Sequence, residues 1–188
     1  QFTPGLAAGA FQVLYMAYTT PLKGLHYLLE AWNGLNLPGA ELVLVGGYGA
    51  IPSELRQQYD AIIRANPTIR CIGKTQSPEE YYRRASVFVL PSLTEGNPHV
   101  VMEAMASGLP VITTENAAGL VEDGKSGFVV PIRDSGAIRA KIEYLYRHLD
   151  AAVRMGREAR RVVENKKPFG EAIFEIYQEI LRRERTHL

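Results

Sequence analysis

The stretch Thr94-Glu-Gly-Asn-Pro-His-Val-Val-Met-Glu-Ala-Met-Ala-Ser-Gly108 decides the fold of this chain. An apolar run over residues 87–91 precedes it and indicates a buried strand. Residues 95–96 then fall in a turn. Asn97 and Pro98 follow as a predicted helix start, because Asn is a favoured N-cap and Pro suits the first helical position. The stretch therefore predicts a strand, a turn and a helix in immediate succession.

The start of this predicted helix is a candidate anion site. The backbone N–H groups of His99 and Val100 fall in the first turn, where no carbonyl of the helix accepts them. Gly96 permits close approach of a ligand, and free N–H groups at a helix start favour phosphate. Glu95 lies before that point and Glu103 lies about one and a half turns after it. Both carboxylates could receive hydroxyl groups of a ligand spread over the helix start.

This segment resembles the Glu-x7-Glu motif of retaining glycosyltransferases of family 4, which have the GT-B fold. The motif here is Glu95, seven residues and Glu103, followed by Ala-Met-Ala-Ser-Gly-Leu-Pro-Val-Ile. The resemblance covers nearly the whole chain in the family's order. Its other parts are the Lys-Gly signature in 21–24, the strand and glycine turn 41–46, Ile72-Gly73, the strand 87–92 ending in Pro-Ser, and the stretch 122–131.

The resemblance implies a carboxy-terminal, donor-binding domain that is one half of a GT-B enzyme. The reaction would move a sugar from a nucleoside diphosphate sugar, with UDP or GDP as the nucleotide, to an acceptor with retention of anomeric configuration. Polysaccharide, lipopolysaccharide or glycolipid synthesis would be the setting. The family's mechanism is described as front-face substitution, in which the leaving phosphate helps to deprotonate the acceptor. No metal or other cofactor is expected.

The same resemblance implies roles for individual residues. Glu103 would accept ribose hydroxyls, Glu95 would contact the donor sugar, and Lys23 would lie beside the diphosphate, where negative charge develops on the leaving group. The N–H groups of His99 and Val100, with Gly96 and Asn97 at the same turn, would also face the diphosphate. The loop of Gly73, Lys74 and Thr75 would border the nucleobase.

Each of these residues also has a simpler interpretation. Glu103 could be a solvent-facing helix glutamate, which the helix dipole favours near an N-terminus. Glu95 could cap local backbone in its turn, Lys23 could be an exposed lysine, and His99 could be a polar residue at the edge of a pocket. The glycine-rich stretch 46–49 could be a turn that needs positive φ rather than part of a nucleotide site.

One departure from the family lies upstream of Lys23. The family has Gly-Arg six and five residues before the lysine, where this chain has Ala17 and Tyr18. The arginine normally paired with the lysine at the diphosphate is therefore missing, although Tyr18 could donate one hydrogen bond. This departure leaves open a non-catalytic nucleotide-sugar binding module, and the fold also leaves open a GT-B sugar-nucleotide epimerase.

Composition limits the remaining possibilities. The chain has 188 residues, 46% of them hydrophobic, which is enough for one globular domain. The formal net charge of +1 gives no general attraction to nucleic acid. Cys71 is the single cysteine, and we expect it to be packed in a strand rather than to act as a nucleophile. No apolar run reaches the ~20 residues that span a membrane.

The expected location is cytoplasmic. The basic run over residues 154–167 is expected to be a solvated helix face, with peripheral contact to the inner face of a membrane as the alternative.

The chain alternates between strand and helix signals, which predicts an α/β, Rossmann-like doubly wound parallel sheet. Residues 1–10 resemble an interdomain linker remnant, and residues 11–188 form a single predicted donor-binding domain without the amino-terminal acceptor half. We therefore expect the isolated chain to be inactive. Strands are expected over 11–17, 42–45, 69–72, 87–90, 111–113 and 128–130, and helices over 22–35, 52–65, from 77, 98–107, 135–149, 151–163 and 170–183.

Overall fold

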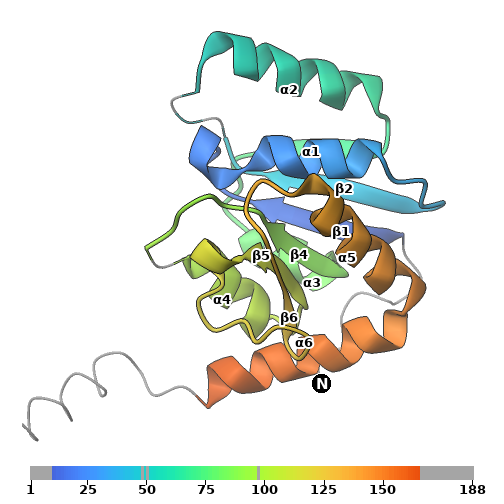
Figure 1. Ribbon diagram of the computed structural model, residues 1–188, viewed down its shortest axis with the longest axis vertical. Coiled ribbons are helices and arrows are strands. Elements are labelled where there is room, and N and C mark those ends of the chain that lie inside the picture. Colours follow the sequence, from blue (N-terminus) through green and yellow to red (C-terminus); the bar gives the residue numbers. More distant parts are fainter. Residues whose placement is uncertain (1–9, 48, 50, 97, 166–188) are drawn as a thin grey trace, which may run out of the picture.

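A six-stranded, entirely parallel sheet forms the centre of the molecule (Figure 1). The computed structural model describes residues 10–47, 49, 51–96 and 98–165. The strands run in the order β3-β2-β1-β4-β5-β6, as in doubly wound nucleotide-binding folds. Their bounds are β1 Phe11–Met16, β2 Ala40–Val45, β3 Ile69–Gly73, β4 Val87–Leu90, β5 Val111–Thr114 and β6 Gly127–Val130.

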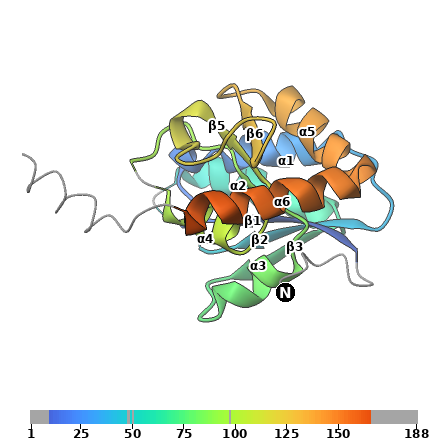
Figure 2. The ribbon, with the colours of Figure 1, turned by 90° about the horizontal axis from the view of Figure 1, so that it is seen from below.

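Helices cover both faces of this sheet. One layer contains α1 and its neighbours α2 and α5, and the other contains α3, α4 and α6 (Figures 1 and 2). The bounds are α1 Leu25–Asn33, α2 Ser53–Ala65, α3 Pro78–Arg84, α4 His99–Ala106, α5 Ser135–Arg147 and α6 Leu149–Glu164, with short 3₁₀ turns η1 Pro21–Lys23 and η2 Glu115–Ala117. The predicted α/β doubly wound architecture is confirmed.

Strand burial explains why the strands contain continuous apolar runs. Every residue of β4 and β5 is buried, and so are four consecutive residues of β1, Val13–Met16. A strand covered by helices on both faces has no solvent side, so its residues do not alternate between apolar and polar. The apolar runs that signalled these strands in the sequence therefore have a direct structural cause.

Strand order reverses between β1 and β4, because successive strands are added on opposite sides of β1. The loops that leave β1 and β4 meet closely at this switch point. Gly24 has φ of +69°, and a Cβ atom there would lie 2.0 Å from the carbonyl oxygen of Pro91. Ligands of open α/β sheets bind in the crevice at such a point. The fold therefore places the candidate site between the loops after β1 and β4.

The contact at Gly24 also corrects one expectation. A single helix over residues 22–35 is wrong, because the chain forms η1, passes through left-handed Gly24 and begins α1 at Leu25. The left-handed residue redirects the chain at its contact with Pro91, so one helix cannot run through it.

Other local expectations also need correction. The helix α4 begins at His99 with Pro98 as its N-cap, so Asn97 is not the N-cap and Pro98 is not the first helical residue. Ser77 is the N-cap of α3 as expected, but its side chain makes no capping bond. Cys71 is exposed rather than packed. Residues 1–9 of the predicted linker and the predicted helix 170–183 lie outside the described residues.

Two helices on opposite faces differ in how firmly they pack. The helix α4 buries Val101, Ala104 and Met105, whereas α2, although longer, buries Tyr59 alone. The ring of Tyr59 stacks on His26 of α1 with centroids 6.3 Å apart, and its hydroxyl lies 3.1 Å from His26 Nδ1. This pair connects α2 to α1. Within the described residues, no helix is long and apolar enough to cross a membrane.

Candidate functional site

An ion pair joins the two loops that meet at the switch point. Lys23 Nζ, at the end of η1, lies 2.5 Å from Glu95 Oε1 in the loop after β4. The Lys23 side chain is 28% exposed and that of Glu95 is 10% exposed, so the pair sits at the mouth of the crevice. The structure thus brings together two predicted site residues that are 72 positions apart in sequence.

Ser92 holds this arrangement from beneath. Its side chain is fully buried, and its hydroxyl oxygen lies 2.9 Å from both Glu95 Oε1 and the carbonyl oxygen of Leu22. A serine hydroxyl has one proton, so it donates to one of these acceptors at a time. The backbone N–H of Leu93 also donates to Leu22 O, at 2.7 Å. Hydrogen bonds from Ser92 and Leu93 therefore link the Glu95 loop to the Lys23 loop.

The loop after β5 braces the same point. The Thr114 hydroxyl donates to the carbonyl oxygen of Ser92, and Asn116 Nδ2 donates to that of Leu93 at 2.7 Å. Three successive strand ends, those of β1, β4 and β5, are thus connected by hydrogen bonds. Such cross-links hold the loops in fixed relative positions.

The start of α4 offers donors next to this cluster. The N–H groups of Val101 and Met102 approach Pro98 O at 2.9 and 3.4 Å, whereas those of His99 and Val100 precede any carbonyl of the helix that could accept them. The His99 side chain is exposed, and the surroundings of Gly96 are open. Asn97 lies outside the described residues. The helix start therefore retains its predicted capacity to bind an anion.

Tyr82 fixes the second glutamate. Its hydroxyl, on α3, donates to Glu103 Oε2 at 2.8 Å. Burial raises the pKa of Tyr82 well above its usual range, and the hydrogen bond to Glu103 raises it further, so the phenol remains a donor. Glu103 itself is exposed. The Glu103 carboxylate is therefore accessible to a ligand, while its Oε2 atom is fixed by the hydrogen bond from Tyr82.

Tyr18 lies with a different group of residues. Its side chain is 59% exposed, and Lys74 Nζ sits 5.7 Å from its ring centroid. Lys74 belongs to the loop after β3, where Gly73 O accepts from Gly46 N at 2.7 Å and Thr75 Oγ1 accepts from the N–H of Ser77. The structure thus pairs Tyr18 with the Gly73–Thr75 loop and Lys23 with Glu95, although the sequence suggested that both approach a diphosphate.

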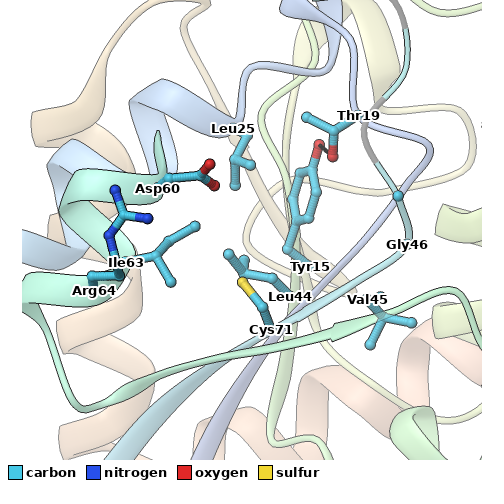
Figure 3. Close-up of a pocket in the computed structure, with 12 residues that line it drawn as sticks. Tyr15, Thr19, Leu25, Leu44, Val45, Gly46, Asp60, Ile63, Arg64 and Cys71 are labelled. Atoms are coloured by element: carbon cyan, nitrogen blue, oxygen red, sulfur yellow. Dashed lines mark hydrogen bonds between the residues drawn. The ribbon is translucent and has the colours of Figure 1, made fainter. Parts of the chain in front are cut away.

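A separate cavity of about 410 Å³ lies between α2 and the strands β1, β2 and β3 (Figure 3). Neither Lys23 nor the two glutamates line it. Its lining consists of Tyr15, Thr19, Leu25, Leu44, Val45, Gly46, Gly47, Asp60, Ile63, Arg64, Cys71 and Gly73. No motif in the sequence predicted this cavity.

The chemical capacity of the switch point follows from these groups. Lys23 and the first N–H groups of α4 can bind an anion, and the carboxylates of Glu95 and Glu103 can accept hydroxyl groups. No cluster of three or more His, Cys, Asp or Glu side chains that could hold a metal ion occurs in the described part of the chain. The arrangement suits a ligand with both phosphate and hydroxyl groups.

Sequence reasoning missed two supporting residues. Ser92 was visible only as the second residue of a Pro-Ser pair after a strand, and nothing local showed that its hydroxyl lies near Leu22 O in another loop as well as Glu95 in its own. Tyr82 lies 21 positions before Glu103, and the bond between them depends on how α3 packs beside α4. Both contacts are tertiary, so only the fold reveals them.

Comparison with known proteins gives a consistent family. Residues 10–148 match the family described as "Glycosyl transferases group 1". The chain is 31% identical over 161 residues to the capsular polysaccharide biosynthesis glycosyltransferase CapM of Staphylococcus aureus, covering 83% of this chain and 42% of that protein. It is 35% identical over 145 residues to the putative colanic acid biosynthesis glycosyltransferase WcaL of Salmonella typhimurium, covering 70% and 35%. The chain thus spans less than half the length of these relatives.

Solved structures share the fold. Anabaena Alr3699/HepE, in complex with UDP and glucose, superposes with a TM-score of 0.78 at 20% identity, covering 92% of this chain and 48% of that one. The C-terminal domain of LpcC, a glycosyl transferase group 1 family protein from Francisella tularensis, gives a TM-score of 0.80 at 20% identity, covering 88% and 95%. At this identity the likeness concerns the fold alone.

Proposed function

This chain belongs to the glycosyl transferases group 1 family and has the GT-B fold of their C-terminal domain, and from that premise we propose that it is the donor-binding domain of a retaining glycosyltransferase. The donor would be a nucleoside diphosphate sugar. The observation that carries this proposal is the cluster at the switch point, where Lys23, Glu95 and the start of α4 meet. It combines a cation, free N–H groups and carboxylates at the place where this fold binds ligands.

Each group has a role in that proposal. The first N–H groups of α4 and Lys23 hold the diphosphate, Glu95 accepts a hydroxyl of the sugar, and Glu103 accepts ribose hydroxyls. When the bond between the anomeric carbon and the phosphate oxygen breaks, that oxygen gains negative charge. A fixed cation and fixed N–H donors stabilise this charge without reorganising. The loop of Gly73, Lys74 and Thr75 contacts the base, next to Tyr18.

Binding must rearrange the pair between Lys23 and Glu95. The charge of Lys23 is compensated by Glu95 at 2.5 Å. A diphosphate competes for the same ammonium group, so it weakens that pair and releases Glu95 toward the sugar. Ser92 keeps Glu95 in place during this exchange, because its hydroxyl can still donate to the carboxylate.

The nucleotide and the product class are proposed from relatives. HepE is described with UDP and glucose, and TarM with UDP and α-GlcNAc-glycerol. CapM and WcaL are named for capsular polysaccharide and colanic acid biosynthesis. We therefore favour a UDP-sugar donor and an acceptor of the cell-surface polysaccharide class. The acceptor would be bound by a further domain, so the isolated chain would transfer little or no sugar.

The proposal is tested by a sugar-nucleotide assay on a protein that contains this chain together with an acceptor-binding domain. Nucleotide release from a panel of UDP- and GDP-sugars should depend on added acceptor, and NMR of the product should show the donor's anomeric configuration. Conversion of the sugar without any acceptor would indicate an epimerase instead. An inverted product would refute retention.

The missing arginine motivates one alternative, a binding module without turnover. Restoring the usual pair with Ala17→Gly and Tyr18→Arg separates the two functions. A large gain in transfer from an inactive parent would indicate a decayed enzyme. A loss from an active parent would indicate that Tyr18 belongs to a working site with its own donor geometry.

A further inference from the structure

The cavity beneath α2 is distinct from the switch-point cluster. Its roof consists of Asp60, Ile63 and Arg64 on α2, and its floor consists of residues from β1, β2, β3 and α1 (Figure 3). The volume of about 410 Å³ falls within the ~300–1,000 Å³ typical of small-molecule sites. Above it, α2 has Tyr59 as its one fully buried residue, while Leu55, Ile62 and Ile63 are only partly buried against the core.

A buried hydroxyl points into this space. Tyr15 is 1% exposed, and its hydroxyl lies 3.5 Å from Thr19 Oγ1, at the outer limit of a hydrogen bond (Figure 3). A buried tyrosine hydroxyl usually has a good partner, because desolvation without one is costly. Thr19 is also buried, at 5% exposure. The two hydroxyls therefore form a polar point on the floor of the cavity, across from Asp60 and Arg64 of the roof.

The lining indicates what kind of molecule fits. Leu25, Leu44 and Val45 present apolar surface, and Cys71 adds a polarisable thiol. A diphosphate would lose its hydration against these apolar side chains and would meet the carboxylate of Asp60 on the roof, so this is not a second donor site. An uncharged ring with one hydroxyl or carbonyl group would bury its apolar part against the aliphatic side chains and bond to the tyrosine hydroxyl.

We propose that the cavity between α2 and strands β1–β3 is a binding site for a small uncharged aromatic or alicyclic molecule that hydrogen-bonds to Tyr15 through a hydroxyl or carbonyl oxygen. This site is independent of the proposed transferase function. It borders the loops after β1, β2 and β3 at Thr19, Gly46, Gly47 and Gly73. The backbones of Gly46 and Gly73 are joined by a 2.7 Å hydrogen bond.

Phenol is the first probe, with benzene as the matched compound without a hydroxyl. The chain is titrated with each and followed by ¹H–¹⁵N NMR. We expect phenol to shift the amides of Gly46, Gly73 and Ile63, and to bind more tightly than benzene. Tyr15→Phe should weaken phenol by about tenfold and leave benzene unchanged, because it removes only the hydroxyl.

A second variant keeps the test decisive if the Tyr15 change disturbs folding. Cys71→Trp starts from an exposed residue that lines the cavity, so its large ring should fill the space. It should abolish binding of both probes while the far-ultraviolet circular dichroism is retained. Absence of phenol shifts at these amides, equal binding by Tyr15→Phe, or undiminished binding by a folded Cys71→Trp would each overturn the proposal.

Discussion

The two sides of the switch point differ in how firmly they are built. On the β4 side, Ser92 and its neighbours connect the loops after β1, β4 and β5, and α4 buries three side chains. On the β3 side, α2 stands away from the strands above a cavity of about 410 Å³ and is held through Tyr59. The ion pair between Lys23 and Glu95 thus lies on the rigid side.

This difference has a chemical reason. Electrostatic stabilisation works best when donors and charges are already in position, since their reorientation costs free energy during the reaction. The hydrogen-bonded side meets that requirement. The cavity side instead leaves open space between α2 and the strands, with Leu25, Leu44 and Val45 in its lining. Small molecules bind in such concave, mostly apolar spaces.

Substitution of Gly24 should break the rigid side with the largest effect. Gly24→Ala places a methyl group 2.0 Å from Pro91 O at a φ of +69°, so steric and backbone costs add. We expect a loss of about 3 kcal/mol or more of unfolding free energy, measured in urea. Gly39→Ala is the control, because φ is +73° but no atom lies within 4 Å; it should cost only ~1–2 kcal/mol. Equal losses would show that the close contact carries no cost.

Removal of the Ser92 hydroxyl should have the next largest effect. Ser92→Ala leaves Glu95 and Leu22 O without this donor at a buried position, which costs about 1–3 kcal/mol. Ser53→Ala, at an exposed hydroxyl on α2, should change the unfolding free energy by less than about 0.5 kcal/mol. If both variants were equally stable, the hydrogen bonds of the Ser92 hydroxyl would contribute nothing to the free energy of unfolding.

Tyr82→Phe sharpens the comparison within the rigid side. It removes the hydrogen bond to Glu103 but keeps the buried ring, so we expect a loss of about 1 kcal/mol in stability. Because the Glu103 carboxylate is then no longer held in position, nucleotide binding should also weaken several-fold, as measured by calorimetry. Tyr146→Phe, which removes a hydroxyl bonded to Pro38 O away from the cluster, is the matched control and should leave nucleotide binding unchanged.

Acid should affect the loose side first, with the smallest effect of the four. Burial lowers the pKa of His26, while the charge of Glu30 partly opposes this shift. As the pH is lowered through about 6.5, His26 becomes protonated in the unfolded chain while it stays neutral in the folded chain. The free energy of unfolding therefore decreases as the pH falls through that window. The protection factors of the α2 amides, which correct for the intrinsic pH dependence of exchange, should fall between about pH 7.5 and 5.5, while those of α4 change less. His26→Gln should remove this difference; an identical pH response in that variant would exclude His26 as its source.

Sequence patterns were sufficient for the sheet and for the residues of the β4 side. The apolar runs, the Lys-Gly pair and the two glutamates are local features, and the parallel topology follows from strands that alternate with helices. Three features were not predictable, because each depends on where another segment packs. They are the interruption of the helix at Gly24, the hydrogen bond from Tyr82 to Glu103 and the exposure of Cys71. The cavity was likewise invisible, since it reflects how far α2 stands from the strands rather than what α2 contains.

The basic run on α6 illustrates a prediction from pattern alone that the structure supports. Arg154, Arg160 and Arg161 form ion pairs with Asp150, Glu164 and Glu158 on the solvent-facing side of α6. Lys166 and Lys167 of the same run lie outside the described residues. These pairs fit the expected solvated face. Peripheral membrane contact remains a prediction that no contact in the described part of the chain tests.

Calorimetric titration of this chain with UDP, GDP and ADP tests the central claim most directly. We predict that one nucleotide binds at the switch point and that Lys23→Ala and Glu103→Gln each weaken it by about tenfold, the equivalent of one charged hydrogen bond. Glu143→Gln, which alters a glutamate paired with Arg147 on α5, should leave the affinity unchanged. Binding that is unaffected by both switch-point variants would contradict the assignment of the donor site to the β1 and β4 loops.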